Sequence, residues 1–209
     1  MSNGAVFSDI AAKYDRINRI LSLGQDQAWR SRVVEHLPAG TLLDLGAGTG
    51  AALPIFGGRR VVALDPAPEM LGLNHSPWRV VGVGEHLPFA DATFDAVFSA
   101  YVIRNLDSVR ETLSEVARVL RSGGKLGIVD LGRPRSPLAR AIHRAATGIV
   151  LNSVGLAFGA RDEYRYLHRS LDKLPQPEEL YSSAPLSLES TWRMGPLGFV
   201  YGAVLTKAR

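Results

Sequence analysis

Five short apolar runs, separated by segments of helical character, constrain the fold more than any other feature of this sequence. They are TLLDLG (41–46), RVVALD (60–65), RVVGV (79–83), FDAVFSAYV (94–102) and KLGIVDLG (125–132). Runs of this length that are rich in Leu and Val are typical of strands buried on both faces of a sheet. Because they alternate with helical segments, they predict a parallel sheet with right-handed crossovers.

The clearest helix lies between the last two of these runs. Ser108 followed by Glu111 forms a capping box, which predicts that the helix begins there. Leu113, Val116, Ala117 and Leu120 form one apolar stripe, and we expect Gly123 and Gly124 to end the helix.

The C-terminal part departs from the alternation. LSLESTWRM (186–194) alternates apolar and polar residues, and GPLG connects it to FVYGAVLTK (199–207). Strands joined so tightly must pair antiparallel, because a parallel pair needs a long crossover. The sequence therefore predicts an α/β fold with a mostly parallel seven-stranded sheet and a C-terminal antiparallel hairpin. This Rossmann-like arrangement is associated with class I methyltransferases.

Composition excludes several classes of protein. The 209 residues, 46% of them hydrophobic, are enough for one well-packed domain. No cysteine is present, which removes disulfides and thiolate chemistry, and the five histidines lack metal-ligand spacing, so we expect no metal. The net charge of +4 comes without a block of basic residues, which argues against a nucleic-acid partner. We see no signal peptide and no apolar run of about 18 residues, and expect a cytoplasmic protein.

The segment DLGAGTG (44–50) is the strongest chemical signal. Glycines at 46, 48 and 50 after a strand predict a tight turn that a ligand can approach closely. Asp65, at the end of the next strand, suits the two hydroxyls of a ribose. Gly46, Gly48 and Ala51 also satisfy a dinucleotide fingerprint, but a carboxylate at Asp44 would repel a pyrophosphate and can receive an ammonium group. The pattern therefore favours S-adenosyl-L-methionine over NAD.

Six segments resemble, in order, the ubiquinone/menaquinone biosynthesis C-methyltransferases. They are 6–30, 44–50, 64–71, 85–107, 115–126 and 164–180, and they cover most of the chain. The resemblance implies transfer of a methyl group from S-adenosyl-L-methionine to a ring carbon of a polyprenylated quinol, with S-adenosyl-L-homocysteine as product and demethylmenaquinol favoured. A methyltransferase acting on another small hydrophobic molecule is the alternative.

The resemblance also implies the residues of the donor site. These are Asp44, Gly46, Ala47, Gly48, Thr49, Gly50, Asp65, Pro66, Met70, Val83, Gly84, Glu85 and Ala100. Thr49 and the glycine loop would hold the methionine part, Asp65 the ribose, and Met70 would lie near the adenine. Ala51, Val83 and Ala100 replace residues that are commonly polar in the family, which leaves room for an altered substrate.

Methyl transfer to a ring carbon needs positioning, an electron-rich carbon and the loss of one proton. Arg104, directly after the fourth predicted strand, is the best candidate for a cation that favours the ionised quinol, and Asn105 could orient a ring oxygen or a water. Tyr14, Tyr166 or His168 could carry the proton, and the acceptor stays open. The expected substrate-binding residues are Tyr14, Asn18, Arg104, Tyr166 and His168.

We expect residues 1–209 to form one domain. Its parts would be a helical lid (1–37), a donor-binding core (38–132), a helical substrate cover (133–180) and the hairpin (181–209). Tyr14, Asp15, Asn18, Trp29 and Arg30 would form the lid; the alternative is a helix whose aromatic residues pack in the core.

The predicted cover has two faces. Leu138, Ile142, Ala145 and Ile149 form an apolar stripe opposite Arg140, His143 and Arg144. We expect the stripe to admit the prenyl tail and the basic face to contact a membrane surface. The alternative is a crossover helix packed on the sheet, and a homodimer stays open.

Overall fold

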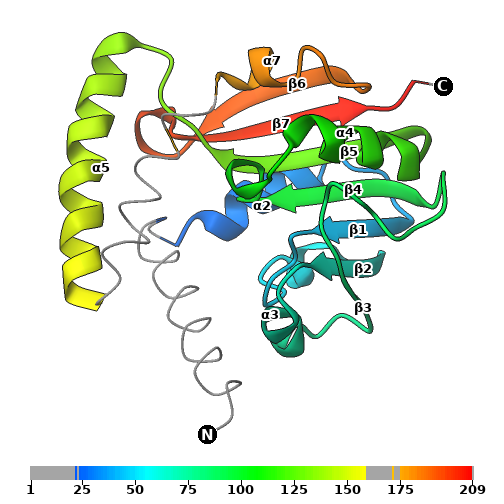
Figure 1. Cartoon of the computed structure of the whole chain (residues 1–209). Coiled ribbons are helices and arrows are strands. Elements are labelled where there is room, and N and C mark those ends of the chain that lie inside the picture. Colours follow the sequence, from blue (N-terminus) through cyan, green and yellow to red (C-terminus); the bar gives the residue numbers. More distant parts are fainter. Residues whose placement is uncertain (1–21, 23, 159–170, 172–174, 209) are drawn as a thin grey trace, which may run out of the picture.

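Seven strands form a single sheet in the order β3-β2-β1-β4-β5-β7-β6 (Figure 1). The computed structural model describes residues 22, 24–158, 171 and 175–208. The strands are β1 (Thr41–Leu45), β2 (Arg60–Asp65), β3 (Trp78–Val81), β4 (Phe94–Ala100), β5 (Leu120–Leu131), β6 (Ser187–Met194) and β7 (Val200–Thr206). Strands β1 to β5 pair in parallel, and β7 pairs antiparallel with both β5 and β6. The predicted fold class is confirmed.

Helices pack on both faces of the sheet. On one face, Trp29 and Val33 of α2 (Asp26–Val34) share a core with Phe98 of β4. On the other, Leu113 and Val116 of α4 (Val109–Val119) pack against the opposite side chains of the same strands. The remaining elements are α3 (Pro68–Leu73), α5 (Pro137–Phe158), α7 (Pro177–Leu180) and the short 3-10 helices η1 (Leu53–Ile55), η2 (Ile103–Asn105) and η3 (Pro196–Gly198).

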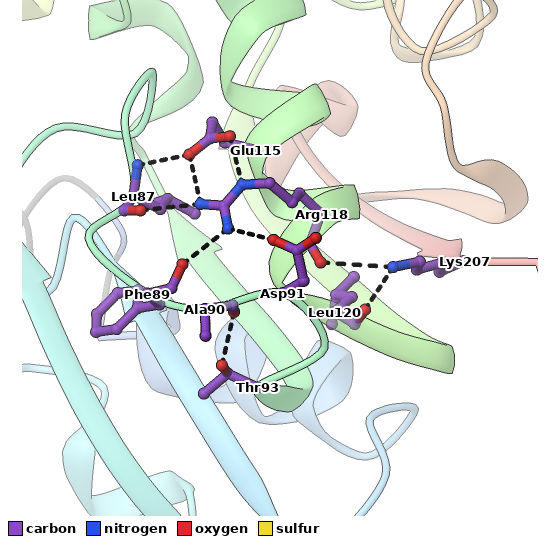
Figure 2. Close-up of polar contacts among 9 residues, drawn as sticks. All are labelled: Leu87, Phe89, Ala90, Asp91, Thr93, Glu115, Arg118, Leu120 and Lys207. Carbon is purple, nitrogen blue, oxygen red and sulfur yellow. Dashed lines mark hydrogen bonds and ion pairs between the residues drawn. The ribbon is translucent and has the colours of Figure 1, made fainter.

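The predicted start of α4 is confirmed, but its predicted end is wrong. Of the predicted capping box the Ser108 half is present, whereas the N–H of Ser108 donates to Oε1 of Glu85 at 3.2 Å. The Ser108 hydroxyl accepts the backbone N–H of Glu111 at 3.2 Å, as expected for an N-cap. The helix ends at Val119, and Gly123 and Gly124 lie within β5. The Nζ of Lys207 donates to the carbonyl oxygen of Leu120 at 2.7 Å (Figure 2). This contact comes from the far end of the chain, so the local pattern contains no sign of it.

Arg118 ties α4 to the loop that precedes β4 (Figure 2). Its guanidinium donates to both carboxylate oxygens of Glu115, to Asp91, and to the carbonyl oxygens of Leu87 and Phe89, at 2.7 to 2.9 Å. Hydrogen bonding from Arg118 lowers the pKa of Glu115 to about 2, against the cost of partial desolvation. The network fixes a loop that starts at the cavity described below.

Helix α5 lies beyond the carboxyl ends of the parallel strands (Figure 1), and one of its residues, His143, differs from the prediction. His143, expected on the basic face with Arg140 and Arg144, is buried and stacks on Phe199 with ring centroids 5.3 Å apart. Leu138 and Ile142, from the predicted apolar stripe, are 72% and 50% exposed. The stacking contact with the hairpin, and not the apolar stripe, orients this part of the helix. The side chain of Ile149 lies outside the described residues.

Over the described ranges, no helix is long and apolar enough to cross a membrane.

Candidate active site

A cavity of about 480 Å³ opens at the carboxyl ends of β1, β2 and β4. Its size falls in the range of small-molecule sites, roughly 300–1,000 Å³. Of the predicted donor residues, Gly46, Ala47, Gly48, Thr49, Asp65, Pro66, Met70, Val83, Gly84, Glu85 and Ala100 line it. Ligands of open α/β sheets bind at this edge, because the loops after neighbouring parallel strands meet there.

The glycine loop is held against β2 by its own backbone. The N–H groups of Gly46 and Ala47 both donate to the carbonyl oxygen of Leu64, at 2.8 and 3.0 Å. Gly46 has a φ of +73°, and a Cβ there would lie 2.2 Å from Cγ2 of Val102. Only glycine fits this turn, which leaves the backbone free to approach a ligand.

Asp65 shapes the loop and also faces the cavity. Its Oδ2 accepts the N–H of Gly48 at 2.9 Å, and its Oδ1 accepts the N–H of Ala67 at 2.9 Å. Each carboxylate oxygen has two acceptor sites, so both oxygens keep one for a further donor such as a ribose hydroxyl.

Asp44 is buried beneath the loop and does not line the cavity; Gly50 does not line it either. Desolvation raises the pKa of Asp44 to about 7. The guanidinium of Arg30 acts to lower this pKa, and the negative charge of Asp65 acts to raise it. Below that pH the carboxyl is neutral, and above it the carboxylate favours a cationic partner.

The titration of Asp44 gives the first prediction. If its carboxylate receives the ammonium of the donor, affinity for S-adenosyl-L-homocysteine should rise between pH 5.5 and 7.5, by up to about tenfold per pH unit below the pKa of Asp44. Calorimetric titration across this range measures the change. Asp44→Asn should bind more weakly with a flat profile, whereas Glu35→Gln, on an exposed residue, should keep the slope. A flat profile in the unmodified protein would contradict the prediction.

Arg104 and Asn105, in η2, occupy different environments. Asn105 lines the cavity, and Arg104 does not. The Nη1 of Arg104 lies 3.3 Å from Oδ1 of Asp130 and donates to the carbonyl oxygen of Tyr101 at 3.1 Å. The side chains of Arg104 and Asp130 are almost fully buried. The expected cation is therefore present at the end of β4, but the carboxylate of Asp130 already compensates its charge.

Several cavity residues were not among the predicted site residues. Tyr101, Val102, Leu106 and Asp107 line the cavity as well. Tyr101 has a φ of +64°, which is rare for a residue with a side chain and typical of functional sites. Its position directly after β4 is the signal that could have identified it.

The residues predicted for the lid divide into two groups. Trp29 is buried in the core under the sheet, with Phe199 at a ring-centroid distance of 6.0 Å, so the core alternative holds for this residue. Arg30, its neighbour, reaches the cavity. Tyr14, Asp15, Asn18, Tyr166 and His168 lie outside the described residues.

No group of three or more His, Cys, Asp or Glu side chains is placed to hold a metal ion within the part of the chain that the structure describes.

Comparison with known proteins gives consistent results. The model of the ubiE/COQ5 methyltransferase family matches residues 2–184. The demethylmenaquinone methyltransferase of Corynebacterium glutamicum (strain R) is 36% identical over 184 residues, which cover 84% of this chain and 80% of the relative. The ubiquinone/menaquinone biosynthesis C-methyltransferase UbiE of Geobacter sulfurreducens is 36% identical over 192 residues, 83% of this chain and 75% of the relative.

Solved structures match the fold at low sequence identity. A SAM-dependent methyltransferase from Thermotoga maritima superimposes with a TM-score of 0.68 and 18% identity, over 97% of this chain and 98% of that one. Phosphoethanolamine N-methyltransferase 2 of Haemonchus contortus, in complex with S-adenosyl-L-methionine, has a TM-score of 0.63 and 17% identity, over 88% of this chain and 52% of that one.

Proposed function

The chain belongs to the ubiE/COQ5 methyltransferase family, and on this premise we propose that it methylates a ring carbon of a polyprenylated quinol, with demethylmenaquinol as the favoured acceptor. It is an S-adenosylmethionine-dependent methyltransferase. The observation that carries the proposed acceptor is the 36% identity to a demethylmenaquinone methyltransferase over 84% of this chain.

The cavity residues fit the donor. The loop at Gly46 has no room for a side chain, and Asp65 keeps acceptor sites toward the cavity. We assign the methionine part to the loop 46–50, with the charge of Asp44 acting from beneath the loop, the ribose to Asp65, and the adenine to the surface around Met70 and Val83. The donor supplies a methyl group on a positively charged sulfur, which is electrophilic without help from a metal.

The protein then has to position the acceptor and favour its ionised form. A quinol that loses a hydroxyl proton pushes electron density onto the neighbouring ring carbon. In our proposal Asn105, which lines the cavity, orients the ring oxygen. Arg104, whose charge is compensated by Asp130, acts by position, because it holds the carbonyl oxygen of Tyr101 at the edge of the cavity. The new carbon–carbon bond forms as the carbon–sulfur bond breaks, and the ring carbon then releases its proton.

The exposed apolar side chains of α5 suit a prenyl tail. Leu138 and Ile142 are exposed on α5. This helix lies beyond the carboxyl ends of the parallel strands (Figure 1), and the cavity opens at the carboxyl ends of β1, β2 and β4. We propose that this stripe contacts the tail or the membrane surface that carries it.

An assay with methyl-labelled donor tests the function. We expect transfer to demethylmenaquinol in vesicles, less to a benzoquinol analogue, and least to an unprenylated ring. A variant with Leu138→Ser and Ile142→Ser should lose activity on the vesicle substrate but keep it on the unprenylated ring. No transfer to any quinol, from protein that binds S-adenosyl-L-homocysteine, would refute the proposed acceptor and favour another small hydrophobic molecule. Equal fractional losses on both substrates, or no loss on the vesicle substrate, would refute the role of the stripe.

A further inference from the structure

Tyr101 is held in a strained backbone conformation by three hydrogen bonds. Its φ of +64° lies in the left-handed region, which is unfavourable for a residue with a side chain. Its N–H donates to the carbonyl oxygen of Val129 at 2.7 Å. Its own carbonyl oxygen accepts Nη1 of Arg104 at 3.1 Å and Nδ2 of Asn105 at 3.4 Å. Strain of this kind persists only where the surroundings enforce it, and it is concentrated at functional sites.

The left-handed conformation changes the face of the sheet on which the ring lies. Successive residues of an extended strand point to opposite faces. Phe98 and Ala100 of β4 pack on the face that α2 covers, so Tyr101 would point to the α4 face if the strand continued. Its ring instead packs against the same core as Phe98 and Ala100. The strain therefore places a phenol on the α2 face, where both Ala100 and Tyr101 line the cavity.

Arg30 of α2 lies over the ring of Tyr101. The guanidinium carbon is 5.3 Å from the ring centre, and both residues line the cavity. The Nε of Arg30 has no hydrogen-bond partner among the described residues, whereas the guanidinium of Arg104 has a carboxylate and a carbonyl acceptor. Burial raises the pKa of Tyr101 to about 12, and the charge of Arg30 acts to lower it. The phenol is therefore protonated at neutral pH, and its O–H can donate a hydrogen bond.

We propose that the hydroxyl of Tyr101 donates a hydrogen bond to the ring oxygen of the acceptor that carries the developing negative charge. This rests on the proposed function and deepens it by assigning a group that favours the ionised acceptor. Tyr101 lies between Ala100, assigned to the donor site, and Asn105, assigned to the ring oxygen, and all three line the cavity. The contact between Arg104 and the carbonyl oxygen of Tyr101 then serves to hold this phenol in place.

The test compares two ring compounds that differ by one oxygen. 1-Naphthol carries a fused aromatic ring and a hydroxyl group, and naphthalene carries the ring alone. Fluorescence titration of the full chain, saturated with S-adenosyl-L-homocysteine, measures both affinities. Tyr101→Phe keeps the ring and its packing, and should weaken binding of 1-naphthol at least about fivefold while naphthalene binds as before. Calorimetric titration should show unchanged affinity for S-adenosyl-L-homocysteine.

Methyl transfer provides a second measurement. With labelled donor and demethylmenaquinol, Tyr101→Phe should lower kcat at least about tenfold and change KM less, because the hydrogen bond strengthens as charge develops on the oxygen. An unchanged kcat would contradict the proposal.

Tyr181→Phe is the matched control, because it removes the same hydroxyl from a buried tyrosine that does not line the cavity. The hydroxyl of Tyr181 is hydrogen-bonded to that of Tyr201 at 2.8 Å, so this variant should lose some stability and bind all three ligands normally. Thermal unfolding of each variant identifies a folding defect.

Three results with folded Tyr101→Phe would overturn the proposal. They are equal losses for 1-naphthol and naphthalene, unchanged binding of 1-naphthol, and weaker binding of S-adenosyl-L-homocysteine, which would assign Tyr101 to the donor. If the unmodified protein methylates no quinol, the proposed acceptor fails. The comparison of 1-naphthol with naphthalene needs no methyl transfer, so it still decides the role of the Tyr101 hydroxyl.

Discussion

Replacing Gly46 by alanine is expected to lower the affinity for S-adenosyl-L-homocysteine at least about a hundredfold, which corresponds to roughly 2.7 kcal/mol. The new Cβ would lie 2.2 Å from Cγ2 of Val102, so either the glycine loop or the segment after β4 must move. Both segments line the cavity. The φ of +73° adds strain of about 1–2 kcal/mol for any residue with a side chain. Calorimetric titration measures the affinity.

Gly57→Ala is the control that separates strain from collision. Gly57 has a φ of +62°, and a Cβ there would meet nothing within 4 Å. It shares the backbone strain of Gly46 without the clash, and it does not line the cavity. We expect Gly57→Ala to lose some stability and to bind normally. If a folded Gly46→Ala protein bound the ligand as well as Gly57→Ala does, the loop would not depend on close packing against Val102.

Replacing Asp130 by alanine is expected to reduce the free energy of unfolding by about 3–5 kcal/mol, because it leaves a buried guanidinium without its counter-ion. Asp130 is 0% exposed and accepts the N–H of Ile103 at 2.8 Å and of Leu131 at 2.7 Å, besides the contact with Arg104. Burial raises the pKa of Asp130, and the charge of Arg104 acts against this increase. Urea unfolding measures the loss. Binding of S-adenosyl-L-homocysteine by folded protein should change little, since neither Asp130 nor Arg104 lines the cavity.

Two further variants test the explanation. Arg104→Met combined with Asp130→Leu removes both charges and should cost less than Asp130→Ala alone. Arg121→Met breaks the exposed ion pair with Asp95, whose side chains are 48% and 28% accessible, and should cost less than about 1 kcal/mol. A double variant that is less stable than Asp130→Ala would show that the unpaired charge is not the main cost. Arg104→Ala should also destabilise the protein, because it leaves Asp130 buried without its counter-ion. In the protein that remains folded, methyl transfer should fall at least about tenfold while donor affinity stays nearly intact.

The parallel sheet and most of the cavity could be predicted because local patterns determine them. Each of these patterns indicates the backbone conformation of its own segment. The patterns are apolar runs of strand length, a capping box and a tight connection between the last strands. Once the strands are parallel, their carboxyl ends must meet, so the loops containing Gly46, Asp65 and Asn105 must lie close together.

The features that the sequence did not indicate are contacts between distant parts of the chain. Lys207 donates a hydrogen bond to the carbonyl oxygen of Leu120, the first residue of β5 after α4 ends. Phe199 stacks on His143 of α5. Asp130 compensates the charge of Arg104. None of these partners lies within a few residues of the group it affects, so no periodicity or spacing indicates it.

The sequence by itself therefore determined the fold class, the family resemblance and the edge of the sheet where the ligand site lies, because these depend on short-range pattern and on the geometry of parallel strands. Only the tertiary structure decided which of two guanidinium groups is satisfied and which is available. Arg104 follows a strand and Arg30 lies on a helix far from it in the chain, yet both come near Tyr101. Their roles differ because of the carboxylates that the fold places beside them, and burial makes that difference large.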